Sequence, residues 1–153
     1  MSGRAFRIVR AGIGDVDRVV PLFEAYRRFY RRAPDPDGSR RFIRERIAAG
    51  DAVVFVALEG DNAIGFVQLY PTYTSVDIGR IWLLNDLYVI EAARRLGVAR
   101  ALLERSIELA RDSGALRLQL ETAADNASAR GLYESAGWVQ IAGSCFYDLW
   151  LNR

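Results

Sequence analysis

The stretch that decides the fold is Leu83–Leu103, LLNDLYVIEAARRLGVARALL, because its hydrophobic pattern changes period in the middle. The first part, up to Ile90, is a short apolar run typical of a strand buried on both faces. From Gly97 onward, apolar residues such as Val98 and Leu102 recur at the spacing of one helix face. The pattern therefore predicts a strand, a tight glycine-containing turn and a helix.

The turn itself, Arg94-Arg95-Leu96-Gly97-Val98-Ala99, has a chemistry that suits phosphate. The first N–H groups of a helix have no partner within it, and the helix dipole places partial positive charge there. Arg94, Arg95 and Arg100 add formal charge around the same point. The spacing alone is equally compatible with an ordinary turn that carries solvated arginines. It matches neither a Walker A loop nor the three-glycine dinucleotide fingerprint.

Composition limits the classes of function. A chain of 153 residues predicts one domain, 1–153. A net charge of +2 with interspersed signs is too weak to indicate a nucleic-acid partner. The single cysteine, Cys145, and the absence of histidine argue against disulfides, metal sites and a Ser–His–Asp triad. We expect no membrane span and no signal peptide, and therefore a cytoplasmic protein.

The rest of the chain alternates between strand and helix patterns. We expect a first helix capped by Asp15, a loop at 33–38, a short second helix around Phe42–Ile47, and a further helix opened by Asn126. Together with residues 81–89, strands are expected at 6–10, 52–58, 64–70, 116–121, 138–141 and 145–151. This order predicts an α/β (α+β) fold with a mixed central sheet and a parallel crossover between residues 81 and 121.

Two motifs resemble those of the GNAT-type N-acetyltransferases. Residues 94–99 match their acyl-CoA signature, Gln/Arg-x-x-Gly-x-Gly/Ala, with Arg95 and Ala99 where many members have glycine. Residues 126–138, NASARGLYESAGW, are similar to their second motif, Asn-x-x-Ala-x-x-Leu-Tyr-x-x-x-Gly-Phe/Trp. The resemblance covers essentially the whole chain. It implies a GNAT fold with about six or seven strands and about four helices, acetyl-CoA as co-substrate, and transfer of its acetyl group to an amine.

The resemblance also implies roles for single residues. Backbone groups of Leu87, Tyr88 and Val89 should pair with the pantetheine arm. The Leu87 or Tyr88 N–H should stabilise the charge that develops on the thioester oxygen. The pyrophosphate should lie on the turn and helix start, which comprise Arg94, Arg95, Leu96, Gly97, Val98, Ala99 and Arg100. Asn126 should contact the cofactor, cap its helix, or do both. Tyr133 stands where the family places a general acid, although a core aromatic is the alternative.

The general base is left open. Thialysine and polyamine acetyltransferases, which this strand resembles, have a glutamate where this chain has Asn85, and an amide cannot take a proton. Asp86 is expected to have a structural role because strand alternation turns it away from Asn85. Glu24, Asp77 and Glu121 are the other candidates.

We expect a small-molecule primary amine as acceptor. Tyr26, Tyr30 and Asn85 are the candidate residues for binding it, with Tyr70, Tyr73 and Trp82 as further aromatic residues in the region. The alternatives are a protein or peptide N-acetyltransferase and a non-catalytic acyl-CoA-binding module. A homodimer is a possible assembly, because the expected final strand pair would offer free edges.

Overall fold

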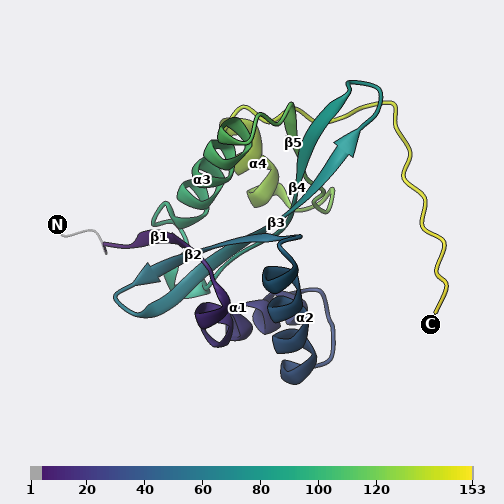
Figure 1. Ribbon diagram of the computed structural model, residues 1–153. Helices are drawn as coiled ribbons and strands as arrows, with labels where there is room; N and C mark the ends of the chain where they lie inside the picture. Colours follow the sequence, from purple (N-terminus) through teal and green to yellow (C-terminus); the bar gives the residue numbers. More distant parts are fainter. Residues whose placement is uncertain (1–4, 153) are drawn as a thin grey trace. The chain divides into compact units, whose positions relative to one another are not determined.

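The structure is a computed structural model that describes residues 5–152. The chain divides into two compact units, one ending at Glu121 and the other beginning at Thr122. In the first unit the strands are β1 (Arg7–Arg10), β2 (Val53–Glu59), β3 (Asn62–Thr74), β4 (Gly79–Val89) and β5 (Arg117–Gln119). Its helices are η1 (Ile13–Asp15), α1 (Val16–Phe29), α2 (Pro36–Ala49), η2 (Glu91–Ala93) and α3 (Val98–Asp112) (Figure 1). The second unit contains α4 (Ala127–Ser135).

The five strands form one mixed sheet in chain order, β1-β2-β3-β4-β5. The first four pair antiparallel, and β5 pairs parallel with β4. The predicted fold class and the parallel crossover through α3 are therefore confirmed. Gly65 and Phe66 are consecutive in β3, and their side chains point to opposite faces of the sheet. Gly65 faces α3, while Phe66 packs against Phe23 and Tyr26 of α1. The two helices thus cover opposite faces.

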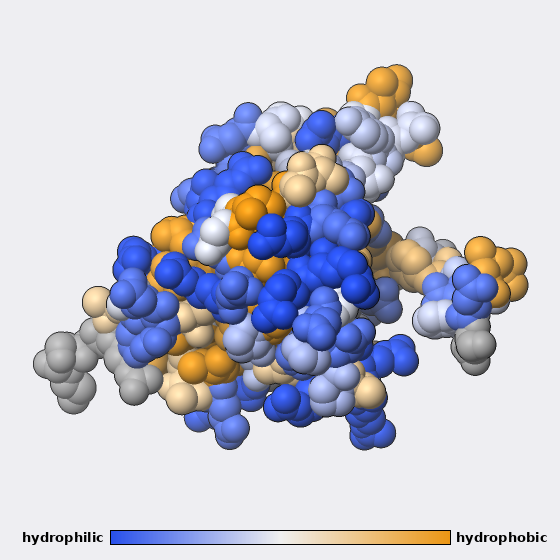
Figure 2. All heavy atoms as spheres, turned by 60° about the horizontal axis from the view of Figure 1, so that its bottom comes forward, coloured by the Kyte–Doolittle hydropathy of each residue, from blue (hydrophilic) through white to orange (hydrophobic). Residues whose placement is uncertain are grey.

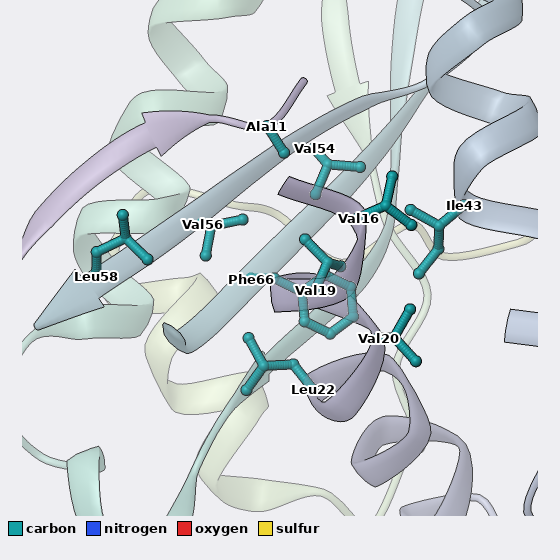
Figure 3. Close-up of a cluster of buried hydrophobic side chains, with 10 residues drawn as sticks. All are labelled: Ala11, Val16, Val19, Val20, Leu22, Ile43, Val54, Val56, Leu58 and Phe66. Atoms are coloured by element: carbon teal, nitrogen blue, oxygen red, sulfur yellow. The ribbon is translucent and has the colours of Figure 1, made fainter. Parts of the chain in front are cut away.

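The core between the sheet and α1 is apolar (Figure 3). Its fully packed members include Phe66 of β3, Val56 of β2 and Val19 of α1, each at most 1% exposed. Pro21 is the sixth residue of α1, and the helix continues past it although proline cannot donate the i→i−4 hydrogen bond there. Figure 2 brings the α1 and α2 side forward and shows a mainly hydrophilic surface with small separate hydrophobic patches.

The second helix is longer than the sequence pattern predicted. The expected loop at 33–38 ends early, because Asp35 caps the helix and Pro36 occupies its first turn. The Asp35 carboxylate accepts a hydrogen bond from the Gly38 N–H at 2.9 Å. At the other helix start, Asp15 lies at the predicted N-cap of α1. Its carboxylate, however, accepts from the Gly12 N–H at 2.8 Å and makes no cap to α1.

The predicted strand count was too high. Residues 138–152 form neither of the two expected strands, so the described chain has five strands rather than six or seven. Alternating apolar residues favour a strand only where a neighbouring strand is available to pair with, and the alternation alone does not produce that hydrogen-bonded pairing. Apolar side chains of the segment, such as Tyr147 at 91% and Leu149 at 86%, remain exposed. The homodimer was predicted from the edges of this strand pair, and that basis is lost.

Candidate active site

One edge of β4 is open along its second half. The parallel pairing with β5 ends at Leu83, and no other described strand continues it. Hydrogen-bonded pairs alternate in an antiparallel ladder. The Ile90 N–H donates to the Ile64 C=O at 3.0 Å, so the backbone groups of Leu87 and Val89 point away from β3. The Arg94 Nε donates to the Val89 C=O at 3.1 Å, which agrees with this direction.

This register separates Leu87 from Tyr88. Tyr88 uses its backbone groups in the ladder to β3, where it lies opposite Phe66. Of the two N–H groups considered for polarising a carbonyl, the Leu87 N–H is therefore the one directed to the open edge.

The turn after β4 has the conformation that its glycine predicted. Gly97 has a φ of 82°, and Arg95 has a φ of 65° although it is not glycine. The Ala101 N–H donates to the Gly97 C=O at 3.0 Å, so the N–H groups of Val98 and Ala99 have no earlier helical carbonyl to bond. The positive end of the α3 dipole therefore carries unshared donors.

The arginines of the turn have different surroundings. Arg94 is held against β4, with its guanidinium 5.9 Å from the centre of the Tyr88 ring. Arg95 and Arg100 are exposed, as is Leu96 at 42%. All three arginines are therefore exposed around the turn, and Arg94 also holds the turn to the strand through its hydrogen bond to the Val89 C=O.

A β-bulge lies at Asn85. Leu69 pairs with Leu84, and Gln68 pairs with Asp86, so Asn85 is the extra residue of β4. Paired residues share a face, whereas Gln68 and Leu69 point to opposite faces. Leu84 and Asp86 therefore point to opposite faces although they are two residues apart. Simple alternation, on which the expected direction of Asp86 was based, fails at this point.

The bulge buries Asp86 on the α1 face, where it is 3% exposed. The Gln68 Nε2 donates to its Oδ2 at 2.5 Å, and the exposed Asn85 Nδ2 donates to its Oδ1 at 3.0 Å. The Tyr26 hydroxyl donates to the Asn85 C=O at 3.2 Å. Burial raises the pKa of Asp86, and hydrogen bonds from Gln68, Tyr26 and Asn85 offset only part of that effect. Gln68 was not identified from the sequence, although an amide within an apolar strand was a usable signal.

The aromatic residues around this point fall into two groups. Tyr26 and Tyr70 are half-buried near Asp86, and burial together with the Asp86 charge raises the pKa of both phenols. Tyr30 packs edge-on to Tyr26, with ring centres 5.0 Å apart. Tyr73 is 71% exposed, and Trp82 is buried on the α3 side, where its Nε1 donates to the Ser113 Oγ at 2.8 Å. The last two therefore lie apart from the Tyr26 group.

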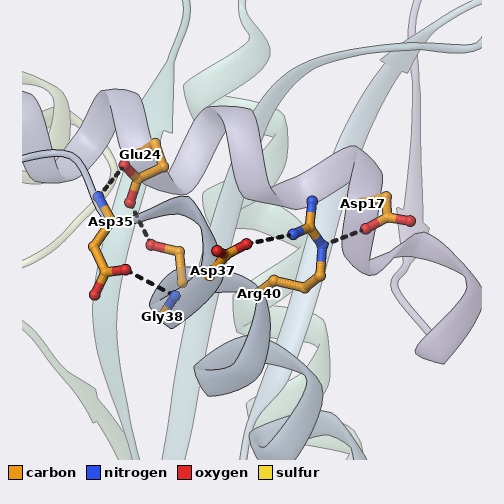
Figure 4. A network of polar contacts seen from close by, with 7 residues as sticks. Asp17, Glu24, Asp35, Asp37, Gly38 and Arg40 are labelled. Atoms are coloured by element: carbon orange, nitrogen blue, oxygen red, sulfur yellow. Dashed lines mark hydrogen bonds and ion pairs between the residues drawn. The ribbon is translucent and has the colours of Figure 1, made fainter.

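Two of the alternative base candidates have other partners. Glu24 accepts hydrogen bonds from the Asp35 N–H at 2.9 Å (Figure 4) and from the Ser39 hydroxyl. It also accepts one from Arg27 at 2.8 Å. These contacts tie α1 to the start of α2, and they lower the pKa of Glu24 in spite of partial burial. Asp77 pairs with Arg117 at 2.9 Å. Glu121 is exposed at the end of the first unit.

The second unit contains the second motif. The Asn126 Oδ1 accepts a hydrogen bond from the Ala129 N–H at 3.2 Å, which confirms its predicted role as a helix cap. Tyr133 lies on α4, half-buried, with its ring centre 6.0 Å from that of Trp138. Gly137, with a φ of 92°, follows the helix.

Comparison with known proteins agrees with these features. Residues 19–138 match the acetyltransferase (GNAT) family. The chain belongs to this family. It is 40% identical over 142 residues to YhfO of Bacillus subtilis, an uncharacterized N-acetyltransferase, covering 93% of this chain and 95% of that protein. A crystal structure of a probable acetyltransferase superposes with a TM-score of 0.90 at 39% identity, covering 96% of this chain and 99% of the other.

A second relative carries a named activity. The chain is 27% identical over 139 residues to the thialysine N-epsilon-acetyltransferase of Caenorhabditis elegans, covering 91% of this chain and 86% of that protein. This GNAT protein is an N-acetyltransferase, and its family takes the acetyl group from acetyl-CoA. No helix among residues 5–152 is long and apolar enough to cross a membrane.

Proposed function

We propose that this GNAT protein transfers the acetyl group of acetyl-CoA to the primary amine of a small molecule. The observation that carries the proposal is the open edge of β4 at Leu87 and Val89, which leads directly into the uncapped start of α3. An extended amide chain and a diphosphate need these two kinds of donor in this order.

The residues present fit the co-substrate. Leu87 and Val89 offer backbone groups to the pantetheine amides in the manner of an added strand. The N–H groups of Val98 and Ala99, with the exposed Arg95 and Arg100 beside them in the chain, suit the pyrophosphate. The turn has the conformation that close approach of a phosphate needs, since Gly97 has a positive φ. In the second unit, Asn126 is proposed as a further contact on the strength of its motif.

The chemistry requires one bond to form and one to break. Acetyl-CoA supplies an activated thioester carbonyl. The neutral amine nitrogen bonds to that carbon, the C–S bond breaks, and the products are an N-acetyl amide and the CoA thiol. The Leu87 N–H donates to the carbonyl oxygen as it gains negative charge. Tyr133 donates its phenol proton to the departing sulfur, and the acylated nitrogen loses one proton, which restores the phenol; this role is supported by the place of Tyr133 in the second motif.

The acceptor side is proposed from residues of the first unit. The phenols of Tyr26 and Tyr30 and the exposed amide of Asn85 lie together around the β4 bulge. Aromatic faces attract ammonium groups, and phenol and amide oxygens accept from them. Acetylation of a small amine by the thialysine acetyltransferase relative supports the same class.

The test is a screen for thiol release from acetyl-CoA. Diamines, amino acids with side-chain amines such as thialysine, and aminoglycosides form one panel, and peptides with free N-termini or lysines form the other. We expect turnover on a member of the small-amine panel at least tenfold above every peptide. Turnover on peptides alone would instead identify a protein N-acetyltransferase, an alternative also represented among relatives by the N-alpha-acetyltransferase of Sulfurisphaera tokodaii.

A further inference from the structure

The β4 bulge creates a buried group of hydrogen-bond acceptors. Asp86 and Gln68 lie opposite each other in the β3–β4 ladder, 3% and 1% exposed. Asp86 forms no ion pair with a described residue, and hydrogen bonds from Gln68, Tyr26 and Asn85 are what stabilise its charge. Such a carboxylate is costly to keep ionised unless a cation pairs with it.

The second acceptor is unused. The Gln68 Nε2 donates to Asp86, which leaves its Oε1 buried without a hydrogen-bond partner. Reversing the amide would direct its oxygen at the carboxylate, which is unfavourable while Asp86 is ionised. A buried acceptor without a donor costs about 1–3 kcal/mol. The carboxylate and the amide oxygen together therefore suit a ligand that has a positive charge and several N–H donors.

The outer side of this group is closed by a single exposed side chain. The Asn85 amide N–H donates to the Asp86 Oδ1. Asn85 is exposed, so its side chain can turn away at little cost and leave that oxygen to an incoming N–H donor. Leu87 follows Asp86 directly in β4, and its N–H points to the open edge. A nitrogen bound at Asp86 therefore lies one residue along β4 from the group that polarises the thioester.

We propose that Asp86 and Gln68 bind the ammonium group of the acceptor and that Asp86 takes its proton. The inference rests on the proposed function and deepens it. One N–H bond of the ammonium breaks, the proton passes to the Asp86 carboxylate, and the neutral amine keeps the electron pair that attacks the carbonyl. Gln68 contacts the ammonium group through its Oε1 and fixes the Asp86 Oδ2 through its Nε2. The raised pKa of Asp86 favours this transfer, because it makes the carboxylate a stronger base.

Other titratable groups also act near this site. Tyr26 and Tyr30 face it from α1, and Tyr70 faces it from β3. The charge of Arg46 lowers the pKa of Tyr70, and the charge of Asp51 raises it. Burial raises the pKa of the Tyr26 and Tyr70 phenols, so both stay neutral at working pH. A titration in the acidic range is therefore assigned to Asp86 among the groups that face the site.

The first test is binding to the wild-type chain, followed by NMR of protein with ¹³C-labelled aspartate carboxyls. Free CoA is present throughout, and 1,4-diaminobutane is the probe, with n-butanol as the neutral control. Asp86→Asn identifies the Asp86 signal. We expect the diamine to shift that signal saturably and to lower its titration midpoint, and n-butanol to leave it unchanged. An Asp86 signal that does not respond to 10 mM diamine, on the order of the weakest useful binding, contradicts the proposal.

The second test is kinetic and uses matched variants. Asp86→Asn should lower kcat/KM for the amine at least 100-fold, with the Kd for acetyl-CoA changed less than threefold. It should also remove the acidic limb of the pH profile. Asp61→Asn, in the exposed β2–β3 turn, is the control. Retention of the wild-type pH profile and kcat/KM in Asp86→Asn overturns the assignment. A wild-type chain that acetylates no amine instead counts against the proposed function, while the NMR result still decides whether Asp86 binds an ammonium group.

Discussion

Gly65 of β3 lies directly against Val98, the first residue of α3. A Cβ at Gly65 would be 3.2 Å from the Val98 Cγ1 and 3.1 Å from the Tyr88 C=O. The start of α3 is therefore held close to β4 by the lack of a side chain at one position of the neighbouring strand, and this contact places the helix N-terminus beside the open edge.

Gly65→Ala should therefore disturb both the fold and the site. Overpacking by one methyl group typically costs about 1–3 kcal/mol, and here it pushes α3 away from β4. We expect lower stability in urea unfolding and weaker acetyl-CoA binding. Gly14→Ala, where no atom lies within 4 Å of the added Cβ, is the control and should change neither. Unchanged binding in Gly65→Ala would show that the contact does not set the site.

Gly97→Ala tests the turn through its backbone alone. Space for the methyl group exists, but the φ of 82° disfavours any residue with a Cβ by about 1–2 kcal/mol. We expect that loss of stability together with weaker CoA binding. Gly131→Ala, inside α4 with no atom within 4 Å of its added Cβ, is the matched control and should stabilise the protein by about 0.5–1 kcal/mol. Equal stability of the two variants would contradict this account of the turn.

Tyr133→Phe tests the proton donor of the second unit. Loss of a general acid lowers the rate about 100-fold or more. We expect this fall in kcat with little change in KM for acetyl-CoA, measured by thiol release. Tyr147→Phe, at an exposed tyrosine of the C-terminal segment, serves as control. If Tyr133→Phe keeps kcat within a factor of three, the phenol proton is not used.

Glu24→Gln tests the junction of α1 and α2 through pH. The hydrogen bonds to Glu24 lower its pKa below the ordinary value of a glutamate side chain. The folded state therefore binds its proton less tightly than the unfolded state, so the stabilisation is present above pH 4.5 and is lost as the pH falls below it. Hydrogen bonds to a charged group contribute about 1.5–3 kcal/mol. Urea unfolding should show a loss of that order for Glu24→Gln at pH 7 and a smaller loss at pH 3.5.

The control for the junction is Glu108→Gln. Glu108 makes an exposed ion pair with Arg105 on α3, and exposed pairs contribute little. A Glu24→Gln loss that is the same at both pH values would mean that packing, rather than charge, holds α1 to α2.

The sequence predicted the centre of the fold well because the signals there are local. The change of period at Gly97, the apolar run of β4 and the glycine at the turn are all properties of neighbouring residues. The cap at Asn126 is local too, and the structure confirms it. Asp35-Pro36 is an equally local helix-start signal, but it was interpreted as part of a loop at 33–38.

The features missed from the sequence depend on partners distant in the chain. The bulge at Asn85 exists only in the register between β3 and β4, so alternation within β4 could not give the direction of Asp86. The Gln68–Asp86 contact joins residues 18 positions apart. The two strands expected after Trp138 failed for the same reason, since their alternating pattern says nothing about what they would pair with.

The most direct measurement for the account as a whole is isothermal titration of the wild-type chain with acetyl-CoA, free CoA and NAD, with Gly97→Ala beside it. The open edge of β4 and the uncapped start of α3 predict micromolar binding of both CoA species, no binding of NAD, and a weakened response in Gly97→Ala. Absence of binding by either CoA species, or equal binding by the wild type and Gly97→Ala, would contradict the site described for Leu87 to Arg100.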